Sequence, residues 1–294
     1  MNGVRLSVLI TGGTGFLGRA LVRELLARDN VHRICVFSRD EAKQAAMRAS
    51  VHDPRACMHY FVGDVRDLKR LTRAMHDVNL VIHTAALKRV EVGEYNPGEM
   101  VKTNVLGTMN VIEAAQDAPI DGPYPSPRRV VYVSSDKACE PKNAYGASKL
   151  MGEKLIMGAQ KARGERGPIY SIVRYGNVAG STGSVIPTWR TAMAQNQFIG
   201  LSDPDATRYW MTIEEAVMLV LDTAATSHGG EIRVPELPAY RLGDLAEAMG
   251  LIEPEIVGLG RGEKAHERML EDGPNSEQAR RMTLQELKEG LAQL

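Results

Sequence analysis

Three glycines, Gly12, Gly15 and Gly18, stand between an apolar run and a helical pattern near the beginning of the sequence. The run at residues 6–10 is rich in aliphatic side chains, and residues 16–28 carry leucines at helical spacing. Glycine permits a tight turn and a close approach of the backbone to a pyrophosphate, and the first turn of a helix presents free N–H groups. The spacing G-x-x-G-x-x-G departs from the common G-x-G-x-x-G. A strand before it and a helix after it nevertheless favour a dinucleotide-binding turn over a turn without a ligand.

Strand-like and helix-like segments alternate through the first half of the chain. Further strands are expected at residues 34–37, 60–62, 80–83, 130–133 and 170–173. Helical patterns are found at residues 41–48, 68–75, 99–115, 144–162 and 213–223. The strands are almost continuously apolar, as in sheets buried on both faces, and such alternation indicates right-handed βαβ units. The predicted fold is α/β, with a Rossmann-like doubly wound parallel sheet.

The regular alternation fades after Arg174. We expect residues 1–174 to form the Rossmann domain, with residues 209–230 returning to it, and residues 175–294 to form mainly a small C-terminal α/β substrate lobe. Within that lobe, short strands are expected at residues 232–234 and 255–257, and short helices at residues 242–249 and 284–291. Two segments rich in proline, glycine or small polar residues, 116–127 and 176–187, are predicted to be loops.

The composition limits the classes of function. The chain has 294 residues and 44% hydrophobic content, enough for a large core, and its 36 basic residues balance 36 acidic ones. This balance, without a block of lysines and arginines, argues against nucleic acid as a partner. No apolar run is long enough to span a membrane, no signal-peptide pattern opens the sequence, and Cys35, Cys57 and Cys139 lack metal-ligand spacing. We therefore expect a soluble cytoplasmic protein with reduced thiols and without bound metal.

The residues after the second expected strand bear on the choice between NAD and NADP. An acidic residue there would bind a ribose 2′-hydroxyl and repel a 2′-phosphate. The sequence instead has Ser38, Arg39 and Asp40, with Lys43 one helical turn further on. Ser38, Arg39 and Lys43 can surround a phosphate, which favours NADP. Asp40 could reach a ribose, which keeps NAD as the less expected alternative.

Residues after the third and fourth expected strands complete the predicted cofactor site. Asp64 can accept a hydrogen bond from an adenine amino group, whereas Asp67 is better placed to cap the following helix. Two alanines after His83 would let the backbone pass close to a ligand, and His83 itself is expected to be a packed core residue. The predicted cofactor-binding residues in these segments are Gly12, Thr14, Gly15, Phe16, Leu17, Gly18, Ser38, Arg39, Lys43, Asp64, Val65, Ala85 and Ala86.

A second cluster of reactive side chains follows the fifth expected strand. Ser135, Asp136 and Lys137 come directly after it. Tyr145 and Lys149 lie four residues apart, which places them on one face of a helix. A lysine beside the phenol, together with a positively charged nicotinamide, is expected to lower the tyrosine pKa and make a base for a hydroxyl proton.

The sequence resembles the inverting UDP-N-acetylglucosamine 4,6-dehydratases of the extended short-chain dehydrogenase/reductase superfamily. Their polysaccharide-biosynthesis group also contains membrane-anchored dehydratases and some 4-epimerases. The resemblance covers most of the chain and is carried by residues 83–90 (HTAALKRV), 102–115 (KTNVLGTMNVIEAA), 134–154 (SSDKACEPKNAYGASKLMGEK), 174–187 (RYGNVAGSTGSVIP), 203–217 (DPDATRYWMTIEEAV), 232–238 (IRVPELP) and 258–270 (GLGRGEKAHERML). Members are somewhat longer, so the C-terminus looks abbreviated after Leu270, and Ser135 stands where many members have threonine.

The resemblance implies a redox-neutral dehydration in which bound NADP is reduced and reoxidised within one turnover. Tyr145 would take the proton of the sugar 4-hydroxyl, with Lys149 beside it. The ketone at C4 makes the C5 proton acidic, so Lys137 would remove that proton while Asp136 protonates the departing C6 hydroxyl. Lys137 must be neutral to do this, and burial near Lys149 and the nicotinamide is expected to lower its pKa.

The resemblance also implies further binding residues. Asn104 would position a water or Lys149 beside the cofactor, and Lys88 would lie near cofactor or substrate. Asn177 and Arg208 would hold the diphosphate of a UDP-sugar, because an arginine fork matches phosphate, and Glu263 would hold the nucleotide ribose. A homo-oligomer is implied as well. The alternatives are a UDP-sugar 4-epimerase, a dehydratase acting on another nucleotide sugar, and a non-catalytic NADP-binding regulator.

Overall fold

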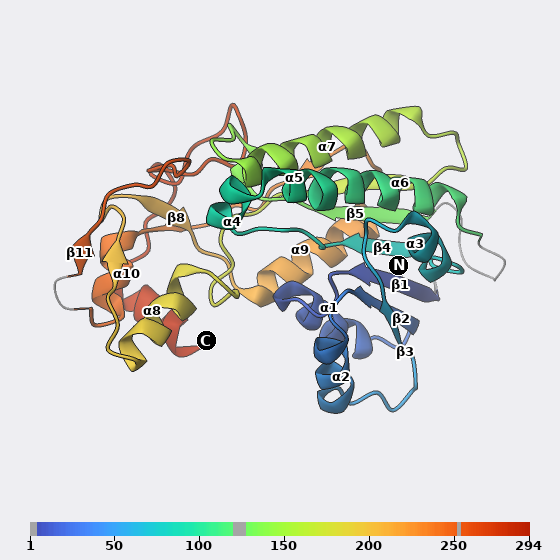
Figure 1. Ribbon diagram of the computed structural model, residues 1–294, viewed down its shortest axis with the longest axis horizontal. Helices are drawn as coiled ribbons and strands as arrows, with labels where there is room; N and C mark the ends of the chain where they lie inside the picture. The colour runs from blue at the N-terminus through green and yellow to red at the C-terminus, as the bar shows by residue number, and fades with distance from the viewer. Residues whose placement is uncertain (1–4, 120–127, 252–253) are drawn as a thin grey trace.

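The computed structural model describes residues 5–119, 128–251 and 254–294, and a parallel seven-stranded sheet forms its centre (Figure 1). The strands lie in the order β3-β2-β1-β4-β5-β6-β9. They are β1 (Leu6–Thr11), β2 (Val31–Ser38), β3 (Met58–Val62), β4 (Leu80–His83), β5 (Arg129–Val133), β6 (Ile169–Val173) and β9 (Ile232–Arg233). The strand order reverses at β1, so a crevice opens at the carboxyl ends of β1 and β4. The predicted Rossmann-like fold is confirmed.

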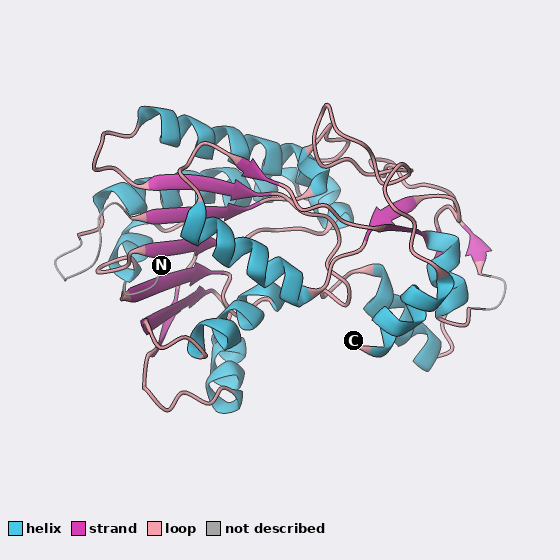
Figure 2. Ribbon diagram, turned by 180° about the vertical axis from the view of Figure 1, so that it is seen from behind, coloured by secondary structure: helices cyan, strands magenta, loops and turns pink. Residues whose placement is uncertain are grey.

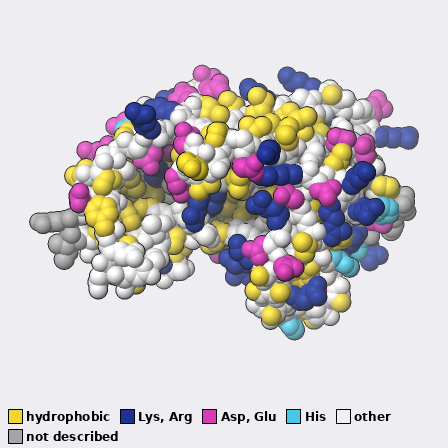
Figure 3. Space-filling view, in the orientation of Figure 1, with side chains coloured by type: hydrophobic (Ala, Val, Ile, Leu, Met, Phe, Trp, Pro, Cys, Tyr) yellow, Lys and Arg dark blue, Asp and Glu magenta, His cyan; other side chains and the backbone are white. Residues whose placement is uncertain are grey.

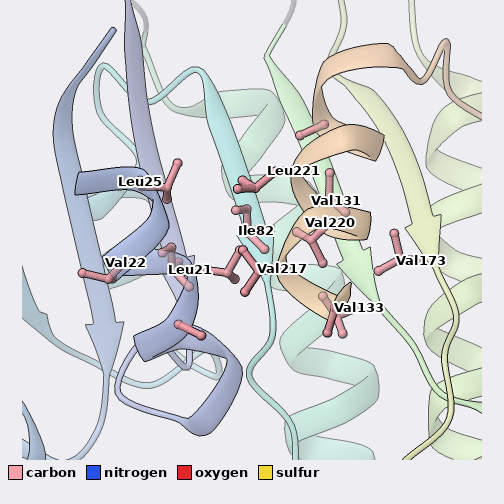
Figure 4. Packing of buried hydrophobic residues seen from close by; sticks show 14 of the residues in the cluster. Leu21, Val22, Leu25, Ile82, Val131, Val133, Val173, Val217, Val220 and Leu221 are labelled. Atoms are coloured by element: carbon pink, nitrogen blue, oxygen red, sulfur yellow. The ribbon is translucent and has the colours of Figure 1, made fainter. Parts of the chain in front are cut away.

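Helices cover both faces of the sheet. One face carries α1 (Phe16–Leu26), α2 (Glu41–Ser50) and α9 (Ile213–Thr226), and the other carries α3 (Leu68–Ala74), α6 (Gly107–Asp117) and α7 (Ala144–Ala162). In Figure 4, Leu21 and Leu25 of α1 and Val220 of α9 lie against Ile82 and Val131 of the sheet. Burial on both faces accounts for strands that are apolar throughout rather than alternating.

The second half of the chain returns to the central sheet through α9 and β9. The hydroxyl of Thr212 accepts a hydrogen bond from the N–H of Glu215, and the Glu215 carboxylate accepts one from the N–H of Thr212, which fixes the start of α9. β9 then pairs in parallel with β6. The expectation that residues 232–234 belong to the small lobe is therefore wrong, because the edge of the central sheet is the partner of this strand.

A smaller lobe stands at the carboxyl ends of the central strands, towards which the strand arrows point in Figure 2. Its helices are α8 (Val185–Ala194), α10 (Leu242–Ala248) and α11 (Leu284–Ala292). Its strands form two small pairs, β8 (Thr207–Tyr209) with β10 (Ala239–Arg241) and β7 (Gly200–Leu201) with β11 (Glu255–Ile256). Trp189, Trp210, Leu245 and Leu287 are buried in a core that is separate from those of the central sheet.

The structure departs from the predicted boundaries at several places. α8 begins at Val185, so the predicted loop 176–187 ends at Ser184, and Pro187 lies in the first helical turn, where its missing N–H is not needed. The predicted helix 99–115 is divided into α5 (Pro97–Met100), a π-helical segment η1 (Val101–Leu106) and α6. Gln116 and Asp117 end α6 instead of opening a loop, and residues 120–127 lie outside the described residues. The short helix α4 (Val90–Tyr95) and the 3₁₀ turn η2 (Asp136–Ala138) are additional elements.

The described residues contain no helix with the length and apolar character that a membrane span requires. Cys35, Cys57 and Cys139 are buried, and each is a free thiol. Cys35 lies on β2, Cys57 directly before the neighbouring β3, and Cys139 after η2.

Candidate active site

A cleft of about 610 Å³ lies between the carboxyl ends of the central strands and the lobe. Its size falls in the range usual for cofactor and small-molecule sites. Lys and Arg side chains gather around the hollow in the middle of Figure 3, and Arg39, Lys43 and Lys88 are among the residues that line the cleft. The residues predicted from the sequence line this cleft, with the exceptions of Asn104 and Asp136, each of which is 1% exposed.

The glycine-rich turn has the geometry that a dinucleotide pyrophosphate requires. Gly12 has a φ of +69°, and a Cβ atom there would lie 2.9 Å from the Oγ1 of Thr84. A Cβ atom on Gly18 would lie 2.6 Å from the backbone of Gly13, so only glycine lets α1 pack this closely on the turn. Gly15 caps α1 without a side-chain acceptor, which leaves the first N–H groups of the helix to a ligand.

The end of β2 presents cations to the cleft. The buried Ser38 hydroxyl accepts a hydrogen bond from a glutamine of α2, and Arg39 is half exposed, with Nη1 3.7 Å from Oδ2 of Asp64. Asp40 is the N-cap of α2: its Oδ1 accepts a hydrogen bond of 2.9 Å from the N–H of Lys43. The Nζ of Lys43 lies 3.2 Å from Oδ2 of Asp40. Asp40 therefore has a structural function as a helix cap, and Arg39 and Lys43 are the cationic side chains that the end of β2 presents to the cleft.

The residues after β3 and β4 separate into capping, core and cleft positions. Asp67 caps α3 through a side-chain hydrogen bond, as predicted, and Asp64 lines the cleft. His83 is buried, with hydrogen bonds to Oγ1 of Thr11 (2.7 Å) and Oγ1 of Thr108 (3.1 Å). Burial lowers the pKa of His83 to about 3, so this side chain is a neutral core residue, as expected from the sequence.

Tyr145 and Lys149 lie in the first turns of α7. The Nζ of Lys149 donates a hydrogen bond of 2.6 Å to the carbonyl of Val133 and lies 4.0 Å from the centre of the Tyr132 ring. Burial lowers the pKa of Lys149 to about 7. Burial also raises the pKa of Tyr145, and the nearby Lys137 opposes that rise only in part. In the protein alone, burial outweighs the neighbouring cation. The expected lowering of the tyrosine pKa also requires a positively charged nicotinamide, so it stays a prediction.

Asp136 and Lys137 are joined by their side chains at the turn η2. The Nζ of Lys137 lies 3.1 Å from Oδ1 of Asp136, and it also donates a hydrogen bond of 3.3 Å to the amide oxygen of Asn177. Oδ2 of Asp136 is buried and has no hydrogen-bond partner among the described residues. Burial raises the pKa of Asp136, and the charge of Lys137 opposes that rise.

The pKa of Lys137 differs from the expectation. Burial alone would lower it, but the carboxylates of Asp136 and Glu267 outweigh burial and raise the pKa of Lys137 above its ordinary value. Oε1 of Glu267 lies 3.4 Å from Nζ of Lys137, and Oε2 lies 3.4 Å from Nζ of Lys264. No sequence pattern points to Glu267, because only the fold brings residue 267 next to residue 137.

The side chain of Asn104 connects the loop after β4 to α7 through hydrogen bonds. Its side chain accepts a hydrogen bond from the N–H of Leu87 and donates to the carbonyl of the same residue, both at 2.8 Å. It also donates to the hydroxyl of Ser148 at 2.9 Å. These bonds orient the amide group. The expectation that Asn104 positions a water or Lys149 stays a prediction.

Three of the residues predicted to hold substrate, Lys88, Asn177 and Arg208, interact with Lys137. Arg208 is 9% exposed and donates hydrogen bonds from Nη1 to the carbonyls of Thr207 and Ala265, so it is not the surface ion pair that a simpler interpretation would assign. Burial lowers the pKa of Lys88, with Arg89 and Lys137 acting in the same direction. Glu263 is exposed at the cleft, and its carboxylate accepts a hydrogen bond from the N–H of Gly260.

Comparisons with known proteins agree with this geometry. The family model described as polysaccharide biosynthesis protein matches residues 8–288. An inverting UDP-N-acetylglucosamine 4,6-dehydratase of Campylobacter jejuni is 41% identical over 90% of this chain and 77% of its own length. A UDP-glucose 4-epimerase of Rickettsia rickettsii is 37% identical with the same coverage of both chains. The X-ray structure of Pen from Bacillus thuringiensis is 32% identical and superposes over 100% of both chains, with a TM-score of 0.90.

Proposed function

Because this chain belongs to the family of polysaccharide biosynthesis proteins, we propose that it is a nucleotide-sugar 4,6-dehydratase that converts UDP-N-acetylglucosamine to a 4-keto-6-deoxy sugar with inversion at C5. The observation that carries the proposal is the Asp136–Lys137 pair, in which a buried carboxyl group is joined to a lysine that lines the cleft together with Tyr145. Oxidation at C4 alone would need only Tyr145 and Lys149. An acid and a base next to them supply what the loss of water requires.

We propose NADP as the cofactor. A bound dinucleotide would supply hydride transfer, from C4 of the sugar and back to C6. The turn around Gly15 and the first N–H groups of α1 fit its pyrophosphate. Arg39 and Lys43, with the hydroxyl of Ser38, would hold a 2′-phosphate. Asp40 would not bind a ribose hydroxyl instead, because its carboxylate caps α2.

The chain's own residues then move the protons. Tyr145 takes the proton of the 4-hydroxyl, and Lys149, whose pKa burial lowers to about 7, lies one helical turn away on the same face. Asp136 donates a proton to the departing C6 hydroxyl, which its raised pKa and its unpartnered Oδ2 support. Lys137 removes the C5 proton after losing its own. Arg208 and Lys88, at the cleft wall, would hold the substrate diphosphate, with Asn177, which contacts Lys137, as a further ligand of the diphosphate.

Proton NMR of the purified protein with UDP-N-acetylglucosamine in heavy water tests the proposal. The expected products are a 6-methyl signal, deuterium at C5 and inverted C5 configuration. Absence of turnover with every UDP-hexosamine would contradict it.

A UDP-sugar 4-epimerase is the second candidate, because the Rickettsia rickettsii relative carries that name at 37% identity. Epimerisation needs oxidation and reduction at C4 only, so it has no use for Lys137. The variant Lys137→Met discriminates between the two activities: dehydration should be lost, whereas an epimerase would keep its rate. A purely regulatory NADP-binding protein would have no need of any of these reactive side chains.

We also propose that the protein is a homo-oligomer. Apolar side chains are exposed together on α4, η1, α6 and α7, namely Val92, Tyr95, Val101, Leu106, Met109 and Met151. A second copy of this chain that covers them would remove a contiguous apolar surface from water. Sedimentation of the wild type and of Met109→Glu tests this, since a charge in a buried contact should shift the distribution towards monomer.

A further inference from the structure

Gln44 is a buried polar residue of α2 to which the proposed reaction gives no function. It is 5% exposed, and its amide lies against the ends of β2 and β3. Its Nε2 lies 2.9 Å from Oγ of Ser38, 3.1 Å from the carbonyl oxygen of Ser38 and 2.9 Å from the carbonyl oxygen of Phe61. Ser38 is 8% exposed and lines the cleft. The Gln44 amide therefore lies directly behind a residue of the proposed 2′-phosphate site.

The orientation of the Gln44 amide is determined by its neighbours. A carbonyl oxygen can only accept a hydrogen bond, so the amide nitrogen must face the carbonyls of Ser38 and Phe61. The reverse orientation would place an amide oxygen against two carbonyl oxygens and leave all three without a donor. The carbonyl of Ser38 also accepts a hydrogen bond of 3.0 Å from the N–H of Gly63. The position of Ser38 is thus fixed from both α2 and the end of β3.

This orientation limits where the hydroxyl proton of Ser38 can point. The amide nitrogen of Gln44 has no lone pair with which to accept, so the hydroxyl can only be the acceptor in this contact. Within the part of the chain that the structure describes, Gln44 is the one residue to which the Ser38 hydroxyl is hydrogen-bonded. The hydroxyl proton is therefore left for a group in the cleft.

A phosphate is the group that gains most from such a donor. Its oxygens only accept, and a hydrogen bond to an ionised acceptor is roughly twice as strong as one between neutral groups. A ribose 2′-hydroxyl is neutral, so it gains less from the same donor.

The other side chains of this site are less firmly held. The side chains of Arg39 and Lys43 are 55% and 67% exposed, and both must lose conformational freedom to hold a phosphate. Ser38 and Gln44 are buried and bonded before a ligand arrives. The preorganised donor of the site is therefore the Ser38 hydroxyl.

We propose that Gln44 is a positioning residue that directs the hydroxyl proton of Ser38 into the cleft and thereby favours a dinucleotide that carries a 2′-phosphate. This inference rests on the proposed use of NADP. Gln44 is not among the described residues that line the cleft, so it acts through Ser38. Arg39 and Lys43 supply the charge, whereas the Ser38–Gln44 pair supplies a donor of fixed direction.

The test compares Gln44→Leu with the wild type by calorimetric titration with NADP and with NAD. Without the amide, the Ser38 hydroxyl can turn inward to the carbonyl oxygens that have lost their donor. The Kd for NADP should rise roughly 10-fold, the effect of one charge-assisted hydrogen bond, and the Kd for NAD should change less than about twofold. A merely structural role of Gln44 would weaken both cofactors alike.

Gln44→Glu reverses the hydrogen bond instead of removing it. An ionised carboxylate would accept the Ser38 proton and would place a negative charge behind the phosphate. The Kd for NADP should then rise on the order of 100-fold, with a much smaller change for NAD.

Ser38→Ala shows whether the effect passes through the hydroxyl. This variant should lose roughly the same 10-fold in NADP binding, and adding Gln44→Leu to it should cost almost nothing more, because the group that Gln44 orients is gone. Ser38→Ala also tests the inference if neither Gln44 variant folds. Gln160→Leu is the matched control, since its amide accepts a hydrogen bond of 2.9 Å from the N–H of Tyr170 on β6 and should leave the NADP-to-NAD ratio unchanged.

The outcomes separate this inference from the cofactor assignment. A wild type that binds NAD more tightly than NADP overturns both. A wild type that prefers NADP, with the preference retained in Gln44→Leu or in Ser38→Ala, overturns the role of Gln44 alone. Full additivity of the Ser38 and Gln44 substitutions would also overturn it, because Gln44 would then act by another route.

Discussion

Arg174 and Glu153 form an ion pair inside the molecule, with Nε of the guanidinium 2.9 Å from Oε1 of the carboxylate and both side chains at most 5% exposed. Glu153 also accepts a hydrogen bond from the hydroxyl of Ser134, and Arg174 donates to the carbonyl of Met269. The pair thus joins α7, the ends of β5 and β6, and the lobe segment that carries Glu267. Because Glu153 is one helical turn after Lys149, it helps to fix the catalytic face of α7.

Glu153→Ala should lower the free energy of unfolding by about 3–5 kcal/mol, since it leaves the Arg174 charge buried without a partner. Urea denaturation measures the change. Asp222→Ala removes the partner of a surface pair with Arg233, in which the aspartate is 62% exposed, and should cost no more than about 1 kcal/mol. Similar losses in the two variants would contradict this account of the buried pair.

Gly18→Ala should impair folding and dinucleotide binding together. The new methyl group would lie 2.6 Å from the backbone of Gly13, where no flexible side chain can yield. Gly158→Ala in α7 is the matched control, because nothing lies within 4 Å of its Cβ position. Alanine there should raise the free energy of unfolding by about 1 kcal/mol, because glycine is a poor helix former. Thermal unfolding with and without NADP measures both effects.

The sheet and its first glycine turn could be predicted because each depends on residues close together in the sequence. The apolar runs that became β1 to β6 are bounded by turn residues, and Phe16 to Leu26 shows a clear helical period. β9 could not be placed in the same way, because a two-residue strand has no period and its partner β6 is about sixty residues earlier. The π-helical turn of η1 likewise has no sequence signature.

His83 makes stability depend on pH in the acid range. Its pKa is about 3 in the folded protein, against an ordinary value of 6.5, so between these values only the unfolded chain binds the proton. The contribution is complete above pH 6.5 and is lost as the pH falls towards 3. From pH 6.5 to pH 5 the wild type should lose about 2 kcal/mol that His83→Gln does not lose. Urea unfolding of both proteins at the two pH values checks this, and parallel losses would show that His83 is not responsible.

Arg39→Ala should weaken NADP binding by roughly 10–100-fold, the effect of one lost charge-assisted hydrogen bond to a phosphate. NAD affinity should hardly change, because NAD has no 2′-phosphate for Arg39 to contact. Calorimetric titration with both cofactors measures the difference. Tighter binding of NAD than of NADP by the wild type would refute the assignment of the cofactor.

The residues of the candidate site could be predicted from the sequence, but their protonation states could not. Asp136, Lys137, Tyr145 and Lys149 were selected from spacing and resemblance, and the fold brings them together. The pKa of Lys137 could not be predicted, because it depends on the balance between burial, Asp136 and Glu267, and only the tertiary structure shows the burial and brings Glu267 near. The protonation state of a buried group depends on every charge around it. The sequence does not show which of these charges are neighbours in space.

The chain enters the small lobe after β6, returns to the large sheet for α9 and β9, and enters the lobe again. The part of the chain that forms the central sheet and the part that forms the small lobe are therefore not separate continuous segments that could be exchanged as units. A chimera joined after Arg174 would take α9, with Val217, Val220 and Leu221, from a foreign donor and lay it on a native sheet. A chimera that exchanges substrate preference between relatives should therefore succeed only if it keeps the native residues 212–233 and exchanges the lobe segments on both sides of them. Evolution of new sugar specificity in such a molecule is expected to proceed by side-chain replacement rather than by recombination of halves.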